Sequence, residues 1–340
     1  MMRHALAGPA AIAGTGVLEE LRIAVPHHAP LVHVLRDGLV ESVHEGSVIA
    51  LAPDGSTLFA AGDPDIAFYP RSTVKPLQAA AMARLGLRPG PAGFAIASSS
   101  HSGEQMHLDA ATSVLDGLDP HLLGNPPALP YDPVERDLWV AAGRGPEQLA
   151  QNCSGKHAAM LATCTLNDWP HGGYLDPDHP LQRSIAATVA ELTGCAIAHT
   201  AVDGCRAPLF AISLRGLARG LAALAAAPPN SPEGLVADGI RRFPELVGGS
   251  RRDVTALMRA VPGLIAKDGA EGVQVAVLPD GTAIALKIGD GADRARRAAL
   301  VGALRRCGLE LPDALADLSP TGVLAADTDL IQHTTKGQQQ

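Results

Sequence analysis

Short apolar runs separated by turn residues occupy the first part of the chain. Runs of four or five mostly apolar residues lie at 31–35, 48–51 and 57–60. The breaks between them contain Asp37-Gly38 and Pro53-Asp54-Gly55, and such residues favour tight turns because glycine and aspartate tolerate a positive φ. The pattern predicts an antiparallel meander in this region.

A similar pattern returns near the other end of the chain. Residues 273–278 and 282–288 are largely apolar, and the separating Pro279-Asp280-Gly281 is typical of a β-hairpin. Apolar residues then recur at helical spacing over 292–306, so we expect a helix there that packs on a sheet.

Between these two regions, apolar residues mostly recur every three or four positions, which predicts helices rather than strands. Ser102 to Gln105 has the spacing of a capping box, which predicts a helix start. The predicted helices cover 72–85, a stretch after 102, a stretch after 154, 180–193, 209–226, 232–243 and 253–261. The Pro/Gly-rich segment 124–133 is predicted to be a surface loop.

Strands at both ends with helices between them predict an α+β fold. In this fold, N- and C-terminal strands form one antiparallel sheet, and a helical region is inserted between them. We expect a single domain over residues 21–330, with a sheet part at about 21–66 and 264–326 and a helical part at about 67–263. Residues 1–20 and 331–340 are expected to be flexible tails.

Composition and charge exclude several functional classes. The net charge of −8 and the aromatic content of 3% argue against nucleic-acid binding, because such proteins carry basic stripes and stacking aromatics. No stretch approaches the roughly 18 continuous apolar residues of a membrane helix. Gly8-Pro9 interrupts the N-terminal apolar run, so no signal peptide is predicted and a cytoplasmic protein is expected. The five scattered cysteines favour free thiols, with or without a metal, over disulfides.

The most suggestive chemistry lies at the start of the first predicted helix. Ser72 and Lys75 are three residues apart, so the lysine amine can reach the serine hydroxyl on one helical face. A serine needs an adjacent base to become a nucleophile, and a lysine can be that base where burial or positive charge favours its neutral form. Backbone N–H groups at a helix start can also stabilise an oxyanion. The ordinary alternative is a capping serine followed by a solvated lysine.

Two further clusters carry hydroxyl, thiol and imidazole groups. The serine-rich turn Ala97–Glu104 is either a helix cap or the source of a second hydroxyl that relays protons. In Gln151–His157, Cys153 and His157 are four residues apart, a spacing that two metal ligands on a helix can use. A capped helix start accounts for the same residues without a metal.

Two more clusters carry charged groups. In Val202–Pro208, Asp203 either satisfies turn amides, binds a substrate ammonium or supports a cysteine metal ligand. In Ala266–Gly272, Lys267 is either solvated or lies at the lip of a sheet, where it would add positive potential beside Lys75.

Together these motifs resemble a known family. Ser-x-x-Lys followed by a serine-rich turn and a late Lys-x-Gly is similar to the layout of penicillin-recognising serine enzymes, although Lys-Asp-Gly replaces their Lys-Thr-Gly. Pro-Arg-Ser-Thr-Val-Lys-Pro, Ala-Ser-Ser-Ser-His-Ser-Gly-Glu, Asn-Cys-Ser-Gly-Lys-His, Val-Asp-Gly-Cys-Arg-Ala-Pro and Lys-Asp-Gly-Ala-Glu-Gly closely resemble the asparaginase II family of Ser-Lys-type L-asparaginases. The resemblance runs in order from about Leu31 to Ala325.

The resemblance implies a serine β-lactamase-like fold, a homodimer, and hydrolysis of L-asparagine to L-aspartate and ammonia through an acyl-enzyme. It implies Ser72 as nucleophile, Lys75 as its base, and Ser100 and Lys267 as a second Ser-Lys pair, with the register among Ser98, Ser99 and Ser100 left open. The substrate-binding residues it implies are Arg71, His101 and Asp203. It also implies zinc held by Cys153, Lys156 and Cys205, whereas the residues alone would favour His157 over the lysine.

Three alternatives remain at this point. The first keeps the catalytic groups and changes the substrate to glutamine or a β-lactam. The second is a non-catalytic protein that binds a metal or an amino acid, with Ser72 only as a cap. The third makes Cys153 or Cys205 the nucleophile.

Overall fold

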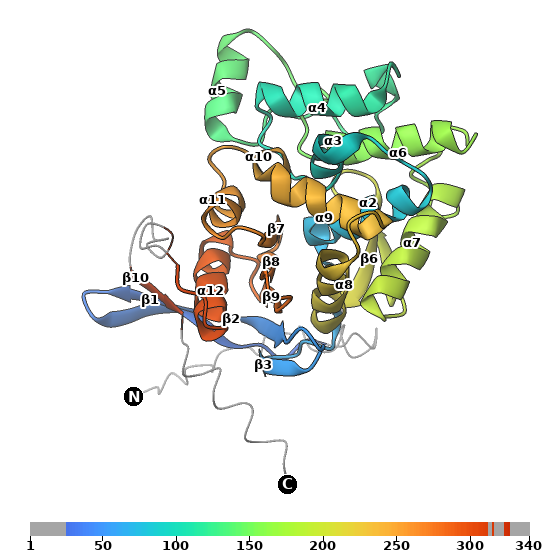
Figure 1. The fold of residues 1–340 in the computed structure, drawn as a ribbon. Helices are drawn as coiled ribbons and strands as arrows, with labels where there is room; N and C mark the ends of the chain where they lie inside the picture. Colours follow the sequence, from blue (N-terminus) through green and yellow to red (C-terminus); the bar gives the residue numbers. More distant parts are fainter. Residues whose placement is uncertain (1–24, 312–314, 316–322, 327–340) are drawn as a thin grey trace, which may run out of the picture.

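The main sheet of the computed structural model contains strands from both ends of the chain (Figure 1). The structure describes residues 25–311, 315 and 323–326, so the predicted tails at 1–20 and 331–340 lie outside the described residues. The strand order is β10-β1-β2-β9-β8-β7, and β3 also pairs with β2. The bounds are β1 (Ala29–Arg36), β2 (Leu39–Leu51), β3 (Thr57–Ala61), β7 (Ile265–Gly269), β8 (Val273–Val277), β9 (Ala283–Ile288) and β10 (Val323–Ala326). The predicted α+β fold with one antiparallel sheet from both termini is confirmed.

Strand β2 lies between strands from the two ends of the chain. Its first half pairs antiparallel with β1, and its second half, from Gly46 to Leu51, pairs antiparallel with β9. A side chain at Gly46 would meet the backbone of Lys287, with a Cβ only 2.4 Å from its carbonyl oxygen. The glycine therefore permits the close approach of β2 and β9.

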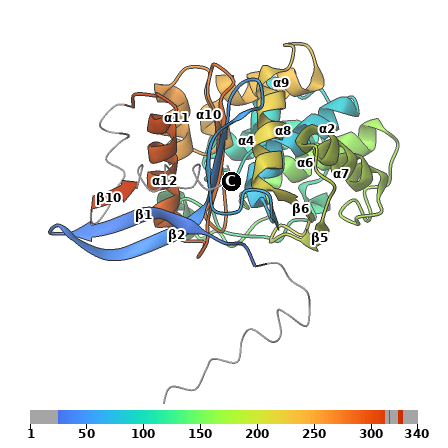
Figure 2. The same ribbon diagram turned by 90° about the horizontal axis from the view of Figure 1, so that it is seen from below.

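Helices cover the sheet on both sides. Helices α8 (Leu214–Ala226) and α12 (Asp293–Arg306) lie on either side of β7, β8 and β9 in both views (Figures 1 and 2). Every residue of β8 is buried, as expected for a strand covered on both faces. This cover explains why residues 273–278 are apolar apart from Gln274, instead of alternating between apolar and polar.

The inserted helical part surrounds helix α2 (Lys75–Arg84). Residues Lys75 to Ala83 are all buried, so α2 contacts protein on every side, including helices α6, α7 and α9. Lys75 therefore begins the helix inside the molecule. The other helices are η1 (Arg71–Val74), α3 (Gly90–Ala97), α4 (Gln105–Leu115), η2 (Pro120–Leu122), α5 (Pro133–Ala141), α6 (Ser154–Leu166), α7 (Pro180–Thr193), α9 (Pro232–Arg242), α10 (Pro244–Val247) and α11 (Asp253–Ala260).

A small second sheet contradicts one predicted helix. Strands β4 (Ala67–Phe68), β6 (Pro208–Ser213) and β5 (His199–Val202) pair in that order, so the predicted helix at 209–226 is wrong in its first five residues. A four-residue apolar run fits a buried strand as well as a helix, and periodicity cannot distinguish them. Helix α8 begins only after Ser213, whose Oγ accepts a hydrogen bond from the Gly216 backbone at 3.1 Å.

The predicted capping box at Ser102 is also wrong. The Ser102 hydroxyl donates to the Gly248 carbonyl at 3.0 Å, and α4 begins at Gln105 without a side-chain cap. The turn at Ser102 is thus hydrogen-bonded to the segment that follows α10 rather than to helix α4.

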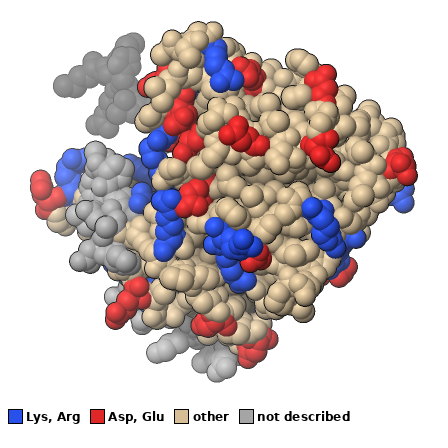
Figure 3. Space-filling model, turned by 45° about the horizontal axis from the view of Figure 1, so that its top comes forward, with Lys and Arg blue, Asp and Glu red and all other residues tan. Residues whose placement is uncertain are grey.

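Two surface properties complete the fold. Acidic and basic side chains are interspersed on the face seen in Figure 3, without a continuous basic stripe. Within the described part of the chain, no helix combines the length and the apolar character needed to cross a membrane.

Candidate active site

Ser72 lies in the short helix η1, directly against the end of strand β7. Contact is close because Gly269 has no side chain: a Cβ there would lie 3.1 Å from the Pro70 carbonyl oxygen and 3.3 Å from the Ser72 backbone nitrogen. Thr73 stabilises the turn by donating its hydroxyl to the Pro70 carbonyl at 2.6 Å. Ser72 remains partly exposed at this junction.

Strained backbone conformations concentrate around this serine. Six non-glycine residues in the described part of the chain have a positive φ, and three of them are aspartates, which tolerate that region. The other three are Arg71 (φ 51°), Arg206 (φ 71°) and Glu271 (φ 62°), and each lies in a motif singled out by the sequence. Such strain persists only where the surrounding structure enforces it, and it is concentrated at functional sites.

Ion pairs connect these strained turns. Arg71 Nε lies 3.0 Å from Asp203 Oδ1, and Arg71 Nη1 lies 3.9 Å from Glu271 Oε1. Burial disfavours the Asp203 carboxylate, but Lys156 and Arg71 outweigh it and lower the pKa of Asp203. Two predicted substrate-binding residues, Arg71 and Asp203, therefore meet beside Ser72.

Lys75 makes different contacts from those expected. Its buried amine donates to the Ser99 carbonyl at 2.5 Å, to Ser100 Oγ at 3.2 Å and to Cys153 Sγ at 3.1 Å. No hydrogen bond joins it to Ser72 Oγ within the described residues, although the i, i+3 spacing predicted one. The buried amine is directed at internal acceptors, whereas Ser72 is partly exposed.

Lys267 approaches the same serine hydroxyl from the other side. Its Nζ on strand β7 lies 3.0 Å from Ser100 Oγ, which therefore lies between two lysine amines. The neighbouring serines do not face the lysines: Ser98 Oγ donates to Phe94 O at 2.9 Å, and Ser99 Oγ donates to Ile96 O at 2.7 Å. The structure thus singles out Ser100 from the run whose register the sequence left open.

The electrostatic environment favours a proton-transfer role for Lys267. Burial lowers the pKa of Lys267 to about 8, with Lys75 acting in the same direction and Asp268 opposing it. A lysine that titrates near neutral pH can both accept and donate a proton during a reaction. For Asp268, burial is outweighed by Lys267, Arg252 and Arg296, which hold its pKa well below the usual range.

The three predicted zinc ligands also come together. Lys156 Nζ lies 3.2 Å from Cys205 Sγ, and the thiols of Cys153 and Cys205 are near enough to shift each other's pKa. Gly155 allows the start of α6 to approach α3, because a Cβ there would lie 2.4 Å from the Ile96 carbonyl oxygen. The two sulfurs and the nitrogen are donor types that zinc accepts.

The charge states of Cys205 and Lys156 affect how readily these residues can bind a metal ion. The neighbouring Cys153 thiol, helped by Lys156, lowers the pKa of Cys205 to about 5 and so favours a thiolate ligand. Burial opposes the charged form of Lys156, but Cys205 and Cys153 outweigh it and raise its pKa, so a metal would have to displace a proton there. No group of three or more His, Cys, Asp or Glu residues within the described ranges could hold a metal. The residues fit zinc only with the lysine as the third ligand.

The two histidines of these motifs are buried away from the partly exposed Ser72. His101 Nε2 lies 2.8 Å from Ser154 Oγ, and its ring is stacked on His107 with centroids 5.1 Å apart. His157 Nδ1 lies 2.7 Å from the Tyr174 hydroxyl. Both side chains are completely buried, and burial holds their pKa well below the usual value. The His101 side chain is thus enclosed by protein, and its role in substrate binding stays a prediction.

Comparison with protein families finds a match over most of the chain. The family described as L-asparaginase II matches residues 32–331, which include every site residue discussed in this subsection. The chain belongs to the L-asparaginase II family. This membership makes it an amidohydrolase, a hydrolase that acts on amides.

Solved structures resemble this asparaginase II family member in fold alone. A β-lactamase from Mycobacterium bovis has 15% identity and a TM-score of 0.44, over 78% of this chain and 95% of that chain. The native form of Mglu has 17% identity and a TM-score of 0.42, over 87% of this chain and 71% of that chain. A Bacillus glutaminase has 16% identity and a TM-score of 0.33, over 72% of this chain and 83% of that chain. No curated protein matches the chain.

Two residues of this asparaginase II site were not assigned a role from the sequence. Asp268 follows Lys267 on β7 and lies 3.0 Å from its amine, and Arg252 forms an ion pair with Asp268. The available signal was a Lys-Asp pair directly before a strongly apolar strand, where two charged residues must satisfy each other to be buried. Arg252 carried no comparable signal, because its partner lies 16 positions away.

Proposed function

We propose that the chain hydrolyses the side-chain amide of L-asparagine to L-aspartate and ammonia, with Ser72 as the nucleophile. The observation that carries this proposal is the Ser100 hydroxyl between Lys75 and Lys267, with its oxygen 3.2 Å and 3.0 Å from the two amines. This arrangement can move protons through a buried site next to a partly exposed serine. Membership of the L-asparaginase II family supports the choice of substrate.

Exposure supports Ser72 rather than Ser100 as the attacking residue. A nucleophile must be reached by the substrate carbonyl, and Ser72 is partly exposed, whereas Ser100 is only 5% exposed. Ser100 Oγ also receives hydrogen bonds from two amines, which suits a group that links them. We assign the relay to Ser100.

The reaction has two stages. Ser72 Oγ gives its proton to Lys75 as it attacks the amide carbon, and the resulting oxyanion lies near backbone N–H groups at the start of the helix. The C–N bond then breaks, and the network of Lys75, Ser100 and Lys267 returns a proton to the departing ammonia. Water attacks the aspartyl ester in the second stage, with the same groups reversing their roles and Ser72 regaining its proton. The Lys75 backbone N–H bonds to the Ser72 carbonyl, so the two residues are neighbours at the start of the helix.

Arg71 and Asp203 are proposed to recognise the α-groups of the substrate. The Asp203 carboxylate matches an α-ammonium, and the Arg71 guanidinium, 26% exposed, matches an α-carboxylate. Their mutual ion pair at 3.0 Å keeps both groups ordered before the substrate arrives. L-Asparagine carries both charges, so a site of this kind distinguishes it from a simple amide.

Zinc remains part of the proposal, held by Cys153, Lys156 and Cys205. When bound there, the ion would supply a fixed positive charge that orients groups beside Asp203, with no role as a source of hydroxide. The contact of 3.1 Å between Lys75 Nζ and Cys153 Sγ links these ligands to the proton network. We also propose a homodimer, which sedimentation equilibrium tests directly.

Substrate comparison with one inactive variant tests the proposed function. Ammonia release from L-asparagine and from L-glutamine, together with hydrolysis of a chromogenic cephalosporin, should show asparagine as the preferred substrate. The Ser72→Ala variant should lose asparagine hydrolysis by orders of magnitude. A preference for glutamine or the cephalosporin would replace the proposed substrate, and an active Ser72→Ala variant would exclude the mechanism.

A further inference from the structure

The amine of Lys267 uses all its hydrogen-bonding capacity on two residues. A lysine ammonium has three donors. In the structure they reach the Asp268 carbonyl oxygen at 2.7 Å, Asp268 Oδ1 at 3.0 Å and Ser100 Oγ at 3.0 Å. With two donors satisfied by Asp268, the third is directed at the serine. Lys267 itself is completely buried, so water cannot replace a missing acceptor.

Asp268 is in turn held by an arginine from another part of the chain. The guanidinium of Arg252, just before α11, bonds to Asp268 Oδ2. Asp268 is its only hydrogen-bond acceptor among the described residues, and the guanidinium stacks over the Tyr131 ring at 4.8 Å. The Asp268 carboxylate therefore has one oxygen on Lys267 and the other on Arg252, which leaves it little freedom to rotate.

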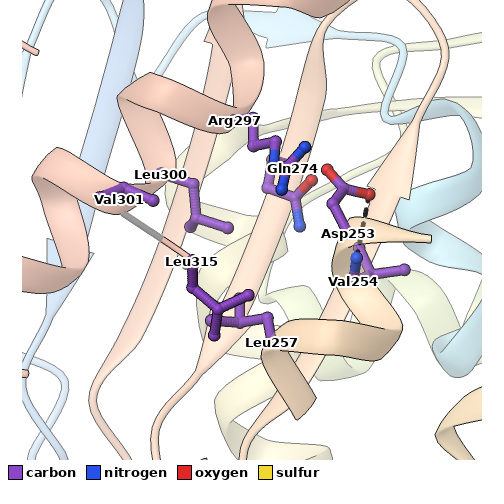
Figure 4. Close-up of a pocket in the computed structure, with 8 residues that line it drawn as sticks. All are labelled: Asp253, Val254, Leu257, Gln274, Arg297, Leu300, Val301 and Leu315. Carbon is purple, nitrogen blue, oxygen red and sulfur yellow. Dashed lines mark hydrogen bonds between the residues drawn. The ribbon is translucent and has the colours of Figure 1, made fainter. Parts of the chain in front are cut away.

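A second arginine links the elements that surround this arrangement. Arg296 on α12 lies 3.0 Å from Asp253 and also bonds to Gln274 on β8. Asp253 and Gln274 lie along a small, mostly apolar pocket between α11, α12 and β8, where Figure 4 shows them side by side. Arg296 thus joins α12 to the two elements that flank the Asp268–Arg252 pair.

We propose that Asp268, held in place by Arg252, is a positioning residue that directs the Lys267 amine at Ser100. The inference deepens the proposed function and rests on it for the kinetic effect, because it concerns how the proton network is aligned. Neither residue contacts the reacting atoms of a substrate. Their effect on catalysis passes through Lys267.

The first experiment compares the Asp268→Asn variant with a matched control. Asparagine is nearly isosteric and keeps an acceptor oxygen but loses the negative charge, so kcat for L-asparagine should fall roughly 10- to 100-fold with KM changed by less than about threefold. The control is Glu233→Gln, which neutralises a buried carboxylate 2.5 Å from Arg84, outside the site. It should leave both constants near the wild-type values. Equal effects of the two variants, or a change in KM alone, would overturn the proposal.

A direct titration gives a readout that does not depend on turnover. The charged groups facing Lys267 are Asp268 on its own strand, Lys75 on α2 and Arg252 ahead of α11. Asp268 is the only anion among them, so neutralising it should move the Lys267 titration to lower pH by one unit or more. With five lysines in the chain, ¹³Cε-lysine NMR is tractable, and the signal lost in Lys267→Arg identifies the residue.

The NMR titration separates the positioning role of Asp268 from the proposed hydrolysis of L-asparagine. If the wild-type protein fails to release ammonia from L-asparagine, the proposed function fails, but the shift of the Lys267 titration in Asp268→Asn still tests the positioning contact. An unchanged titration would overturn the inference even in an active enzyme. The Arg252→Lys variant gives the same test should Asp268→Asn not fold: it keeps the charge and loses the planar geometry, and it should lower kcat roughly 3- to 10-fold at constant KM. Unchanged kcat in Arg252→Lys would also count against the proposal.

Discussion

Ser100 Oγ lies 3.0 Å from Lys267 Nζ, although the two residues are 167 positions apart in the chain. The first belongs to the turn after α3 in the helical part, and the second to strand β7 of the main sheet. The contact therefore forms only when the helical part and the sheet pack together. The proton network we propose is a property of their junction.

Removing the Ser100 hydroxyl should break the hydrogen-bonded link between the amines of Lys75 and Lys267. In Ser100→Ala, we expect kcat for L-asparagine to fall about 10²- to 10⁴-fold, the range of a lost general acid–base group. Ser98→Ala and Ser99→Ala are matched controls, because each removes only one bond to a helix carbonyl. They should lower stability by about 1 kcal/mol and leave kcat nearly unchanged. Steady-state ammonia release and thermal unfolding measure both effects, and a fully active Ser100→Ala variant would contradict the relay.

Activity should rise with pH through the titration of Lys267. Its pKa is lowered to about 8, mainly by burial, so the neutral amine that can accept a proton becomes populated as the pH increases past that value. The pH profile of kcat should therefore have a rising limb near pH 8. Lys267→Arg stays protonated at every assay pH and should be weakly active without this limb. A rising limb retained in that variant would assign the titration to another group.

Asp203 should affect the binding of the substrate more than its conversion. If its carboxylate binds the α-ammonium, Asp203→Asn should raise KM for L-asparagine roughly 10-fold or more, with a smaller change in kcat. Succinamate has the same amide and lacks the α-amino group, so it is the matched control substrate. The variant should process succinamate as the wild type does. A similar loss for both substrates would mean that Asp203 acts through its 3.0 Å ion pair with Arg71 instead.

Zinc content should depend on two of the five cysteines. Cys153→Ser and Cys205→Ser should each lose bound zinc as measured by elemental analysis of the purified protein, because each removes a soft ligand. Cys195→Ser is the control, since Cys195 is a free cysteine that bonds to Ser213 and Thr193 rather than to the candidate ligands. Zinc retained by both ligand variants, or absent from the wild type after growth with zinc, would contradict the predicted site.

Much of the fold could be predicted from the sequence, because local signals determine it. Turn residues such as Asp280-Gly281 delimit the strands, and Gly194, with a positive φ of 63°, ends helix α7 where the sequence predicted. The prediction failed at Leu209, where a short apolar run fits a strand or a helix and only its partners β4 and β5 decide. Strand pairing of this kind depends on tertiary contacts, which the local sequence does not show.

The site could be predicted in its residue types but not in its contacts. The motifs placed Ser72, Lys75 and Lys267 among the reactive groups, and the order of the motifs led to the family. The hydrogen bond from Lys75 to Ser100 instead of Ser72 could not be predicted, because it depends on which acceptors from other elements lie near the buried amine. The same holds for Arg252 and Asp268, whose pairing follows from the packing of the α11 region on β7.

The most direct test is to find the residue that carries the acyl group. Wild-type protein mixed with L-asparagine is quenched in acid within milliseconds, digested and analysed by peptide mass spectrometry. The account predicts a mass increase of one aspartyl group on the peptide that contains Ser72 and its absence in Ser72→Ala. An aspartyl group on Ser100, Cys153 or Cys205, or turnover by Ser72→Ala, would contradict it.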